Sequence, residues 1–441
     1  MKLISETFEN GGPKGPVHPP IHQTMSPVLL ADPRTFASGP PHDAFKLLRR
    51  EAPIAWNEEP TPVQQGFWSV TRYADVARVN NDPRTFSSQR GGILMAYGPR
   101  ESPMTRAAID AMICMDAPAH LQIRREHMSY FTPAYLRGVK DKVAAETTRL
   151  LDAMAPMGEC DLVEQLSAQL PLFTLCEILG VPPSDRPRFL HWMHFLEKSN
   201  SLRSLHEDGA QGPFDYEQFI RDFNDATGEM FEYGVRMLHK RRAEPQADLM
   251  SAIACAQLDG EPLNDGFLTG SWLLIVFAGN DTTRNTISGA MHLLSRFPGE
   301  KEKLLAEPGL LPGAVNEFIR MISPILYMRR TATRDVEIAG QPIAEGEKVI
   351  MYYVSANRDE DVFVDPDRLD VTRDNADQHI AFGQSPHVCI GRRVAQLQLE
   401  EVYRQVLGRF PDIRQSGEME VEPNNFVYAI RKLPVAFTPR T

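Results

Sequence analysis

The chain has 441 residues, of which 42% are hydrophobic and 24% charged, so it has enough apolar side chain for a large core. This composition excludes disordered, collagen-like and coiled-coil proteins. Acidic residues outnumber basic ones by 58 to 47, and the net charge of −11 argues against a nucleic-acid partner. The five cysteines are odd in number and irregularly spaced, which argues against a disulfide framework or a paired-cysteine zinc site.

The first 25 residues are rich in glycine and proline and contain no apolar run. We therefore expect a flexible segment at 1–25, no secretory signal, and a single folded domain at 26–441. No stretch approaches the roughly 20 apolar residues of a membrane span, so we expect no membrane anchor and a cytoplasmic protein.

Apolar spacing predicts the secondary structure. A strand is expected over 67–70, followed by an amphipathic helix that ends near residue 81, because the spacing changes there from alternating to helical. Helical spacing then predominates in the segments 119–131, 133–154, 162–179, 187–198, 216–241 and 268–297. Short β-like runs begin after residue 331 and return near 426–430, with an irregular stretch at 357–377 and a last helix at 392–407. The pattern predicts one large, mainly α fold with a small β-region.

The segment AFGQSPHVCIGRR, 381–393, places Cys389 just ahead of a predicted helix. Free N–H groups and the partial positive charge of a helix N-terminus stabilise a thiolate, which is a good metal ligand. Gly383 and Gly391 allow close approach of the backbone to a flat ligand, and Phe382 can pack against the sulfur. From the residues alone, a buried core cysteine remains the alternative.

The run FGQSPHVCIG resembles the haem-binding signature of the cytochromes P450. The resemblance extends from about residue 43 to the end of the chain. It implies the P450 fold, mainly α with a small β-region, and haem b between a distal helix and the cysteine loop. Cys389 is then the iron ligand, and Phe382, His387 and Gly391 contact the cofactor. Ser385 departs from the family pattern, which usually has a second glycine there.

A second segment, EFIR, resembles the family's ExxR pair. Glu317 and Arg320 are three residues apart, which puts both side chains on one face of a helix. Alone, such a pair is an ordinary solvated helix pair. The resemblance makes it part of a buried network whose third member is identified as Arg368, with a structural role in clamping the irregular stretch before the cysteine loop.

The helix around AGNDTT, 278–283, contains an acid in an otherwise apolar sequence, which is costly without a partner or a use. A core helix with a kink and a satisfied polar spot is one interpretation. The segment also resembles the P450 distal helix, whose acid and alcohol relay protons to dioxygen at the haem. The resemblance makes Asp281 and Thr282 the catalytic residues, and Ala278 lies beside the cofactor.

Haem propionates are anions that need cations or donors inside the fold. His120 and Arg124 have i, i+4 spacing on a predicted helix that resembles the family's propionate-crossing helix. Arg330 resembles the arginine that reaches the propionates from a strand, and His387 adds a donor. For each residue alone, surface solvation is the simpler interpretation.

Family position also indicates a substrate pocket with almost no charge, which favours a lipophilic substrate. Its expected residues are Ile93, Leu94, Met95, Phe277, Ala278, Ile325, Leu326, Phe426 and Val427.

The resemblance implies a haem-thiolate monooxygenase that uses O2 to hydroxylate a C–H bond of an apolar small molecule such as a terpene, alkane or steroid. Because the sequence has no nucleotide-binding glycine motif, two electrons are expected from a [2Fe-2S] or similar ferredoxin and its NAD(P)H-dependent ferredoxin reductase. Basic residues expected near the cysteine side for that partner are Arg125, Lys140, Lys142, Arg392 and Arg393.

Three alternatives keep part of this interpretation. A haem-thiolate peroxygenase or rearrangement enzyme would use the same cofactor, although the intact Asp281 and Thr282 pair disfavours it. A haem sensor without turnover and a helical binding protein without haem are the others.

Overall fold

A computed structural model describes residues 25–59, 66–97, 102–193, 195 and 216–440. The segment expected to be flexible, 1–25, lies outside these residues except for Met25, which forms an isolated bridge with Trp56.

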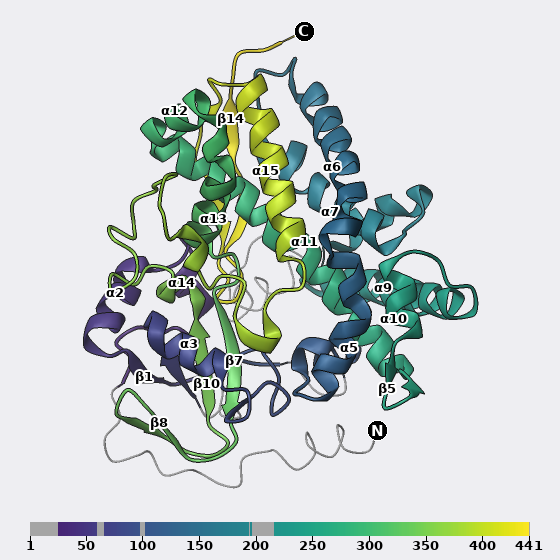
Figure 1. Ribbon diagram of the computed structural model, residues 1–441, viewed down its shortest axis with the longest axis vertical. Coiled ribbons are helices and arrows are strands. Elements are labelled where there is room, and N and C mark those ends of the chain that lie inside the picture. Colours follow the sequence, from purple (N-terminus) through teal and green to yellow (C-terminus); the bar gives the residue numbers. More distant parts are fainter. Residues whose placement is uncertain (1–24, 60–65, 98–101, 194, 196–215, 441) are drawn as a thin grey trace.

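The fold is mainly α with a small β-region, as predicted. In Figure 1 the helices fill the upper and right parts of the view, and the largest sheet lies at the lower left, beside α2 and α3. Beyond the helices named below, the described part contains α2 (His42–Glu51), α3 (Tyr73–Asn81), α4 (Pro103–Ile109), α6 (Pro133–Met154), α9 (Tyr216–Ala243), α10 (Leu249–Cys255), α12 (Pro298–Ala306) and α14 (Tyr353–Ala356).

Most predicted helical segments agree with the observed bounds to within a few residues. The segment 162–179 is divided into a π-helix (Val163–Ser167) and α7, which begins at Gln169. The segment 187–198 is helical over 186–193, and the rest of it lies largely outside the described residues. Apolar spacing does not predict α2, α4, α10 or α12, because helices of seven to ten residues contain too few turns to establish a period.

The five-stranded sheet has the order β1-β2-β10-β7-β3, formed by β1 (Ile54–Asn57), β2 (Phe67–Val70), β10 (Lys348–Tyr352), β7 (Tyr327–Ala332) and β3 (Phe86–Ser87). Only the β10 and β2 pair is parallel. A second sheet joins β4 (Glu159–Asp161) to β14 (Pro434–Ala436) and β11 (Arg414–Gln415). The predicted run near 426–430 ends in β13 (Ala429–Lys432), which pairs with β12 (Glu420–Glu422).

The long helix α11 (Asp265–Arg296) passes through the interior and is mostly buried. Its N-terminus is capped by Asn264, whose side chain accepts a hydrogen bond from the N–H of Phe267. Close packing requires small residues along it. A Cβ on Gly270 would lie 2.5 Å from the carbonyl oxygen of Asp110, and one on Gly279 would lie 2.9 Å from Leu175 of α7 (Gln169–Leu179).

Helices α13 (Leu311–Ile322) and α15 (Arg392–Arg409) pack against α11 in one large apolar core. The loop that precedes α15 carries Cys389, so α11 and this loop lie on opposite sides of the same interior space. In the described part of the chain, no helix is both long enough and apolar enough to cross a membrane.

Candidate active site

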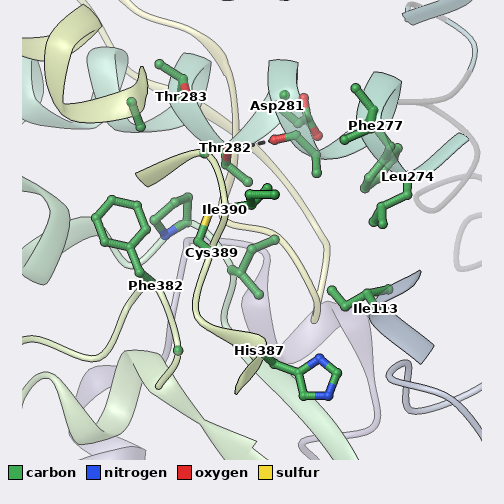
Figure 2. Close-up of a pocket in the computed structure, with 18 of the residues that line it drawn as sticks. Ile113, Leu274, Phe277, Asp281, Thr282, Thr283, Phe382, His387, Cys389 and Ile390 are labelled. Carbon is green, nitrogen blue, oxygen red and sulfur yellow. Dashed lines mark hydrogen bonds between the residues drawn. The ribbon is translucent and has the colours of Figure 1, made fainter. Parts of the chain in front are cut away.

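A cavity of about 430 Å³ lies between α11 and the cysteine loop. Figure 2 shows Cys389 and Phe382 on the loop, with Thr282, Asp281 and Phe277 on the helix above them. The other walls come from α4, α5 (Ala119–His127), α7, β7 and the segment around Phe426. The cavity therefore joins segments that are far apart in the sequence.

The cysteine loop is shaped by its own backbone. The N–H of Cys389 donates to the carbonyl oxygen of Phe382 at 2.8 Å, and Gly383 has a φ of +68°. Ser385 also has a positive φ, +57°, in the left-handed region that glycine adopts without steric cost. The family's usual glycine at this position is thus explained by the backbone, which serine adopts under strain.

The thiol of Cys389 lies deep in the protein with its side chain open to the cavity. Burial raises the pKa of this thiol, whereas the N–H groups of Gly391 and Arg392 and the charges of Arg124 and Arg392 lower it. The first turn of α15 therefore supplies the stabilising donors that the sequence predicted. All five cysteines are free.

On the opposite wall, Asp281 is 6% exposed and lines the cavity. Its carboxylate lies 2.5 Å from the guanidinium of Arg284, which is also buried. The Thr282 hydroxyl lines the cavity as well and donates to the carbonyl oxygen of Ala278 at 3.1 Å. An acid and an alcohol are thus adjacent on α11 and face the cysteine loop.

Four basic residues from three segments line the same cavity: His120, Arg124, Arg330 and His387. The two imidazole rings stack with centroids 4.0 Å apart. Burial lowers the pKa of His387 to about 2 and that of His120 to about 4, and the charges of Arg124 and Arg330 act in the same direction. Burial and these two charges both favour the neutral form of the rings.

The ExxR pair is fully buried. Arg320 donates to both carboxylate oxygens of Glu317, at 2.7 and 2.8 Å, and to the carbonyl oxygens of Asn357 and Pro366. This arrangement ties α13 to the irregular stretch that leads to the cysteine loop, as predicted.

The prediction for the third member of this network was wrong. Arg368 is exposed, and Arg373 instead places its Nε 3.1 Å from both carboxylate oxygens of Glu317. Arg373 takes this place because the chain turns back after Arg368. Its guanidinium therefore also donates to the carbonyl oxygens of Val364 and Arg368.

Two residues assigned to the pocket were also wrong. Met95 and Leu326 do not line the cavity but lie in an apolar cluster on the other side of the sheet region. Their neighbours Leu94 and Ile325 do line it. Leu326 points away because successive side chains of an extended segment point in opposite directions, whereas Met95 lies in a bend that turns its side chain out of the cavity. The remaining expected residues, Ile93, Phe277, Ala278, Phe426 and Val427, line the cavity.

A further wall of the cavity, not predicted from the sequence, is formed by α4 and α7 and includes Met104, Ala108, Thr174, Leu175 and Ile178. A signal for α7 was present, because its sequence QLPLFTLCEIL is apolar on nearly all sides, as is typical of a helix that is buried all round.

Comparison with known proteins identifies the family. The family model described as "Cytochrome P450" matches residues 110–432. The chain belongs to the cytochrome P450 family. It is 36% identical over 420 residues to linalool 8-monooxygenase of Pseudomonas putida, a match that covers 93% of this chain and 99% of that protein. It is 34% identical over 415 residues to the steroid C26-monooxygenase of Mycobacterium tuberculosis, with 93% and 97% covered.

A solved structure supports the same family assignment. The Mycobacterium marinum cytochrome P450 CYP268A2 in complex with pseudoionone has a TM-score of 0.83 and 31% identity, and the match covers 96% of this chain and 100% of that one. The chain is thus a cytochrome P450 monooxygenase, and the family implies a haem-thiolate cofactor.

The residues around the cavity fit a dianionic macrocycle. Within the described ranges, neither Arg124 nor Arg330 forms an ion pair, although both line the cavity and the charge of Asp116 acts on Arg330. Nδ1 of His120 is buried and has no hydrogen-bond partner among the described residues. A buried donor without a partner is costly, so this wall is built for an acceptor that the chain itself does not supply.

Proposed function

We propose that this cytochrome P450 uses O2 and two electrons to hydroxylate a C–H bond of a lipophilic small molecule such as a terpene, alkane or steroid. One observation carries the proposal: above Cys389 the cavity wall is almost wholly aliphatic or aromatic, and Asp281 and Thr282 are adjacent polar groups on it. Burial of apolar surface would bind such a substrate. The wall has few polar groups that could fix the orientation of the substrate.

The printed names of the relatives support this substrate class. They include monooxygenases of linalool and of a steroid, and a methyl-branched lipid omega-hydroxylase of Mycobacterium bovis that is 32% identical over 404 residues.

The cofactor in this proposal is haem b. Cys389 is its ligand, and Phe382, Ala278 and Gly391 lie along the space that it would fill. His120, Arg124, Arg330 and His387 bind its propionates. When bound, thiolate-ligated haem supplies the redox chemistry that activates dioxygen.

Asp281 and Thr282 move protons in this proposal. Asp281 takes a proton from water and passes it toward the cavity, and the Thr282 hydroxyl holds the receiving oxygen by a hydrogen bond. A short relay of this kind keeps bulk water away from the substrate while it delivers protons.

Electrons come from a [2Fe-2S] or similar ferredoxin, which an NAD(P)H-dependent ferredoxin reductase reduces. Arg392 and Arg393 are exposed in the first turn of α15, next to the cysteine loop, and Arg125 is exposed on α5. These cations complement an acidic partner. Lys140 is exposed too, whereas Lys142 is already paired with Glu177 at 2.6 Å and contributes less charge to this surface.

The test is a spectral screen followed by turnover. Linalool, a medium-chain alkane and testosterone are titrated into the haem-loaded protein, and the shift of the Soret band toward shorter wavelength is measured. Any compound that binds is then incubated with ferredoxin, its reductase and NAD(P)H. A hydroxylated product whose new oxygen derives from labelled O2 supports the proposal. Product formed only with added peroxide would instead identify a peroxygenase, and no product under either condition would favour a haem sensor.

A further inference from the structure

The ring of His387 is held on two sides. Its face stacks on His120 with an interplanar angle of 26°, and its Nε2 lies 3.3 Å from the hydroxyl oxygen of Ser88. Ser88 is 1% exposed and is 299 positions away in the chain. Figure 2 shows His387 on the part of the loop that points away from α11.

The segment that carries Ser88 is itself held in place. The carboxylate of Asp116 accepts hydrogen bonds from the N–H of Ser88 at 2.8 Å and from the hydroxyl of Ser87. The Ser87 oxygen in turn accepts the N–H of Arg90 at 2.9 Å. Asp116 directly precedes the turn into α5, which carries His120 and Arg124, so one carboxylate links the Ser88 segment to the helix that carries two of the basic residues.

A neutral imidazole has one N–H donor and one acceptor nitrogen, and the partner of one nitrogen determines the role of the other. When Ser88 donates its hydroxyl hydrogen to Nε2, the ring carries its hydrogen on Nδ1. That nitrogen would then be free to donate to a carboxylate such as a haem propionate. The stack on His120 restrains the plane of the ring, and the contact with Ser88 restrains its rotation within that plane.

We propose that Ser88 is a haem-positioning residue that acts through His387: it occupies Nε2 and thereby presents Nδ1–H to a haem propionate. The proposal rests on the propionate role of His387 given above. Ser88 does not itself need to touch the cofactor, since its effect is to orient and polarise the ring that does.

The experiment measures the rate of haem transfer from the ferric protein to excess apomyoglobin, a readout independent of turnover. Loss of one orienting hydrogen bond in Ser88→Ala should accelerate transfer roughly fivefold. Ser88→Thr, which keeps a hydroxyl, should restore a rate near that of the unmodified protein. If Ser88→Ala does not fold, Ser88→Cys replaces it; its weaker donor should give an intermediate rate.

The double variant separates this inference from a general effect of the loop. His387→Phe should accelerate transfer at least as much as Ser88→Ala, and adding Ser88→Ala to His387→Phe should change nothing further. An equal acceleration by Ser88→Ala in the His387→Phe background would overturn the inference, as would an unchanged rate in Ser88→Ala alone. If His387→Phe itself left the rate unchanged, the propionate role of His387 would be wrong, and this inference with it.

Discussion

The carboxylate of Asp281 lies 2.5 Å from a guanidinium nitrogen of Arg284, one turn farther along α11, and both side chains are more than nine-tenths buried. The neighbouring Thr282 hydroxyl is bonded to the carbonyl oxygen of Ala278. Both groups assigned to proton delivery are thus engaged within their own helix in this structure. To reach an oxygen in the cavity, Asp281 must leave Arg284, and Thr282 must share or exchange its hydrogen bond.

We therefore expect Arg284→Gln to change the amount of hydrogen peroxide released per NAD(P)H consumed, because the guanidinium holds the carboxylate that carries the proton. Asp281→Asn should change it more. In the Asp281→Asn background, Arg284→Gln should add nothing, since its partner carboxylate is gone. An additive effect would show that Arg284 acts on the protein in some other way.

Thr282→Ala should keep the haem spectrum and the affinity for substrate but divert electrons into peroxide, because the receiving oxygen loses its hydrogen-bond donor. We expect roughly a tenfold or greater loss of product per electron, within the range of general acid and base effects. Thr283→Ala is the matched control on the same helix. Unchanged coupling in Thr282→Ala would contradict the relay.

Arg373, not Arg368, completes the network around Glu317. Removing the charge in Arg373→Gln leaves a fully buried carboxylate with one cation fewer, so we expect a loss of about 3 kcal/mol in the free energy of unfolding and poorer haem retention. Arg368→Gln, at an exposed position, should stay within about 0.5 kcal/mol of the parent. Urea titration of both variants measures the two losses. A larger loss in Arg368→Gln than in Arg373→Gln would restore Arg368 as the third member of the network.

Ser385 lies within the cysteine loop, before Cys389, and has a left-handed backbone conformation. Ser385→Gly should raise the free energy of unfolding by about 1 kcal/mol, because the steric cost of a Cβ at this φ exceeds the entropy that glycine adds to the unfolded chain. The matched control is Ser184→Gly, at an exposed position without a positive φ, which should destabilise slightly. Denaturant midpoints of the two variants should therefore move in opposite directions.

We expect His127 to contribute to the loss of stability in acid. It is 1% exposed, and burial lowers its pKa from 6.5 to about 4. Between these two pH values the unfolded chain binds a proton that the folded protein does not. The free energy of unfolding therefore falls as the pH falls through this window, by about 1.4 kcal/mol per pH unit, with no effect above pH 6.5.

His127→Leu should remove up to about 3 kcal/mol of this loss over the whole window. Both ring nitrogens of His127 lack a partner among the described residues, so the apolar replacement breaks no hydrogen bond there. Urea titrations at pH 7, 6, 5 and 4.5 measure the slope.

Local spacing was sufficient for much of the fold. The sequence predicted the helix at 133–154 and the strand at 67–70 with the observed bounds, because a period of 3.6 or 2 residues is a property of a short stretch of chain. The same holds for Glu317 and Arg320 on one helical turn and for Cys389 just ahead of α15.

Only the tertiary structure decided which distant residues meet. Arg373 displaced Arg368 because the irregular stretch 357–377 has no period from which to infer its path, and Met95 and Leu326 proved to point away from the cavity. The contact of Ser88 with His387 leaves no local trace either. Sequence periodicity records which face of an element is buried, whereas the partner on the other side is chosen by packing of the whole chain.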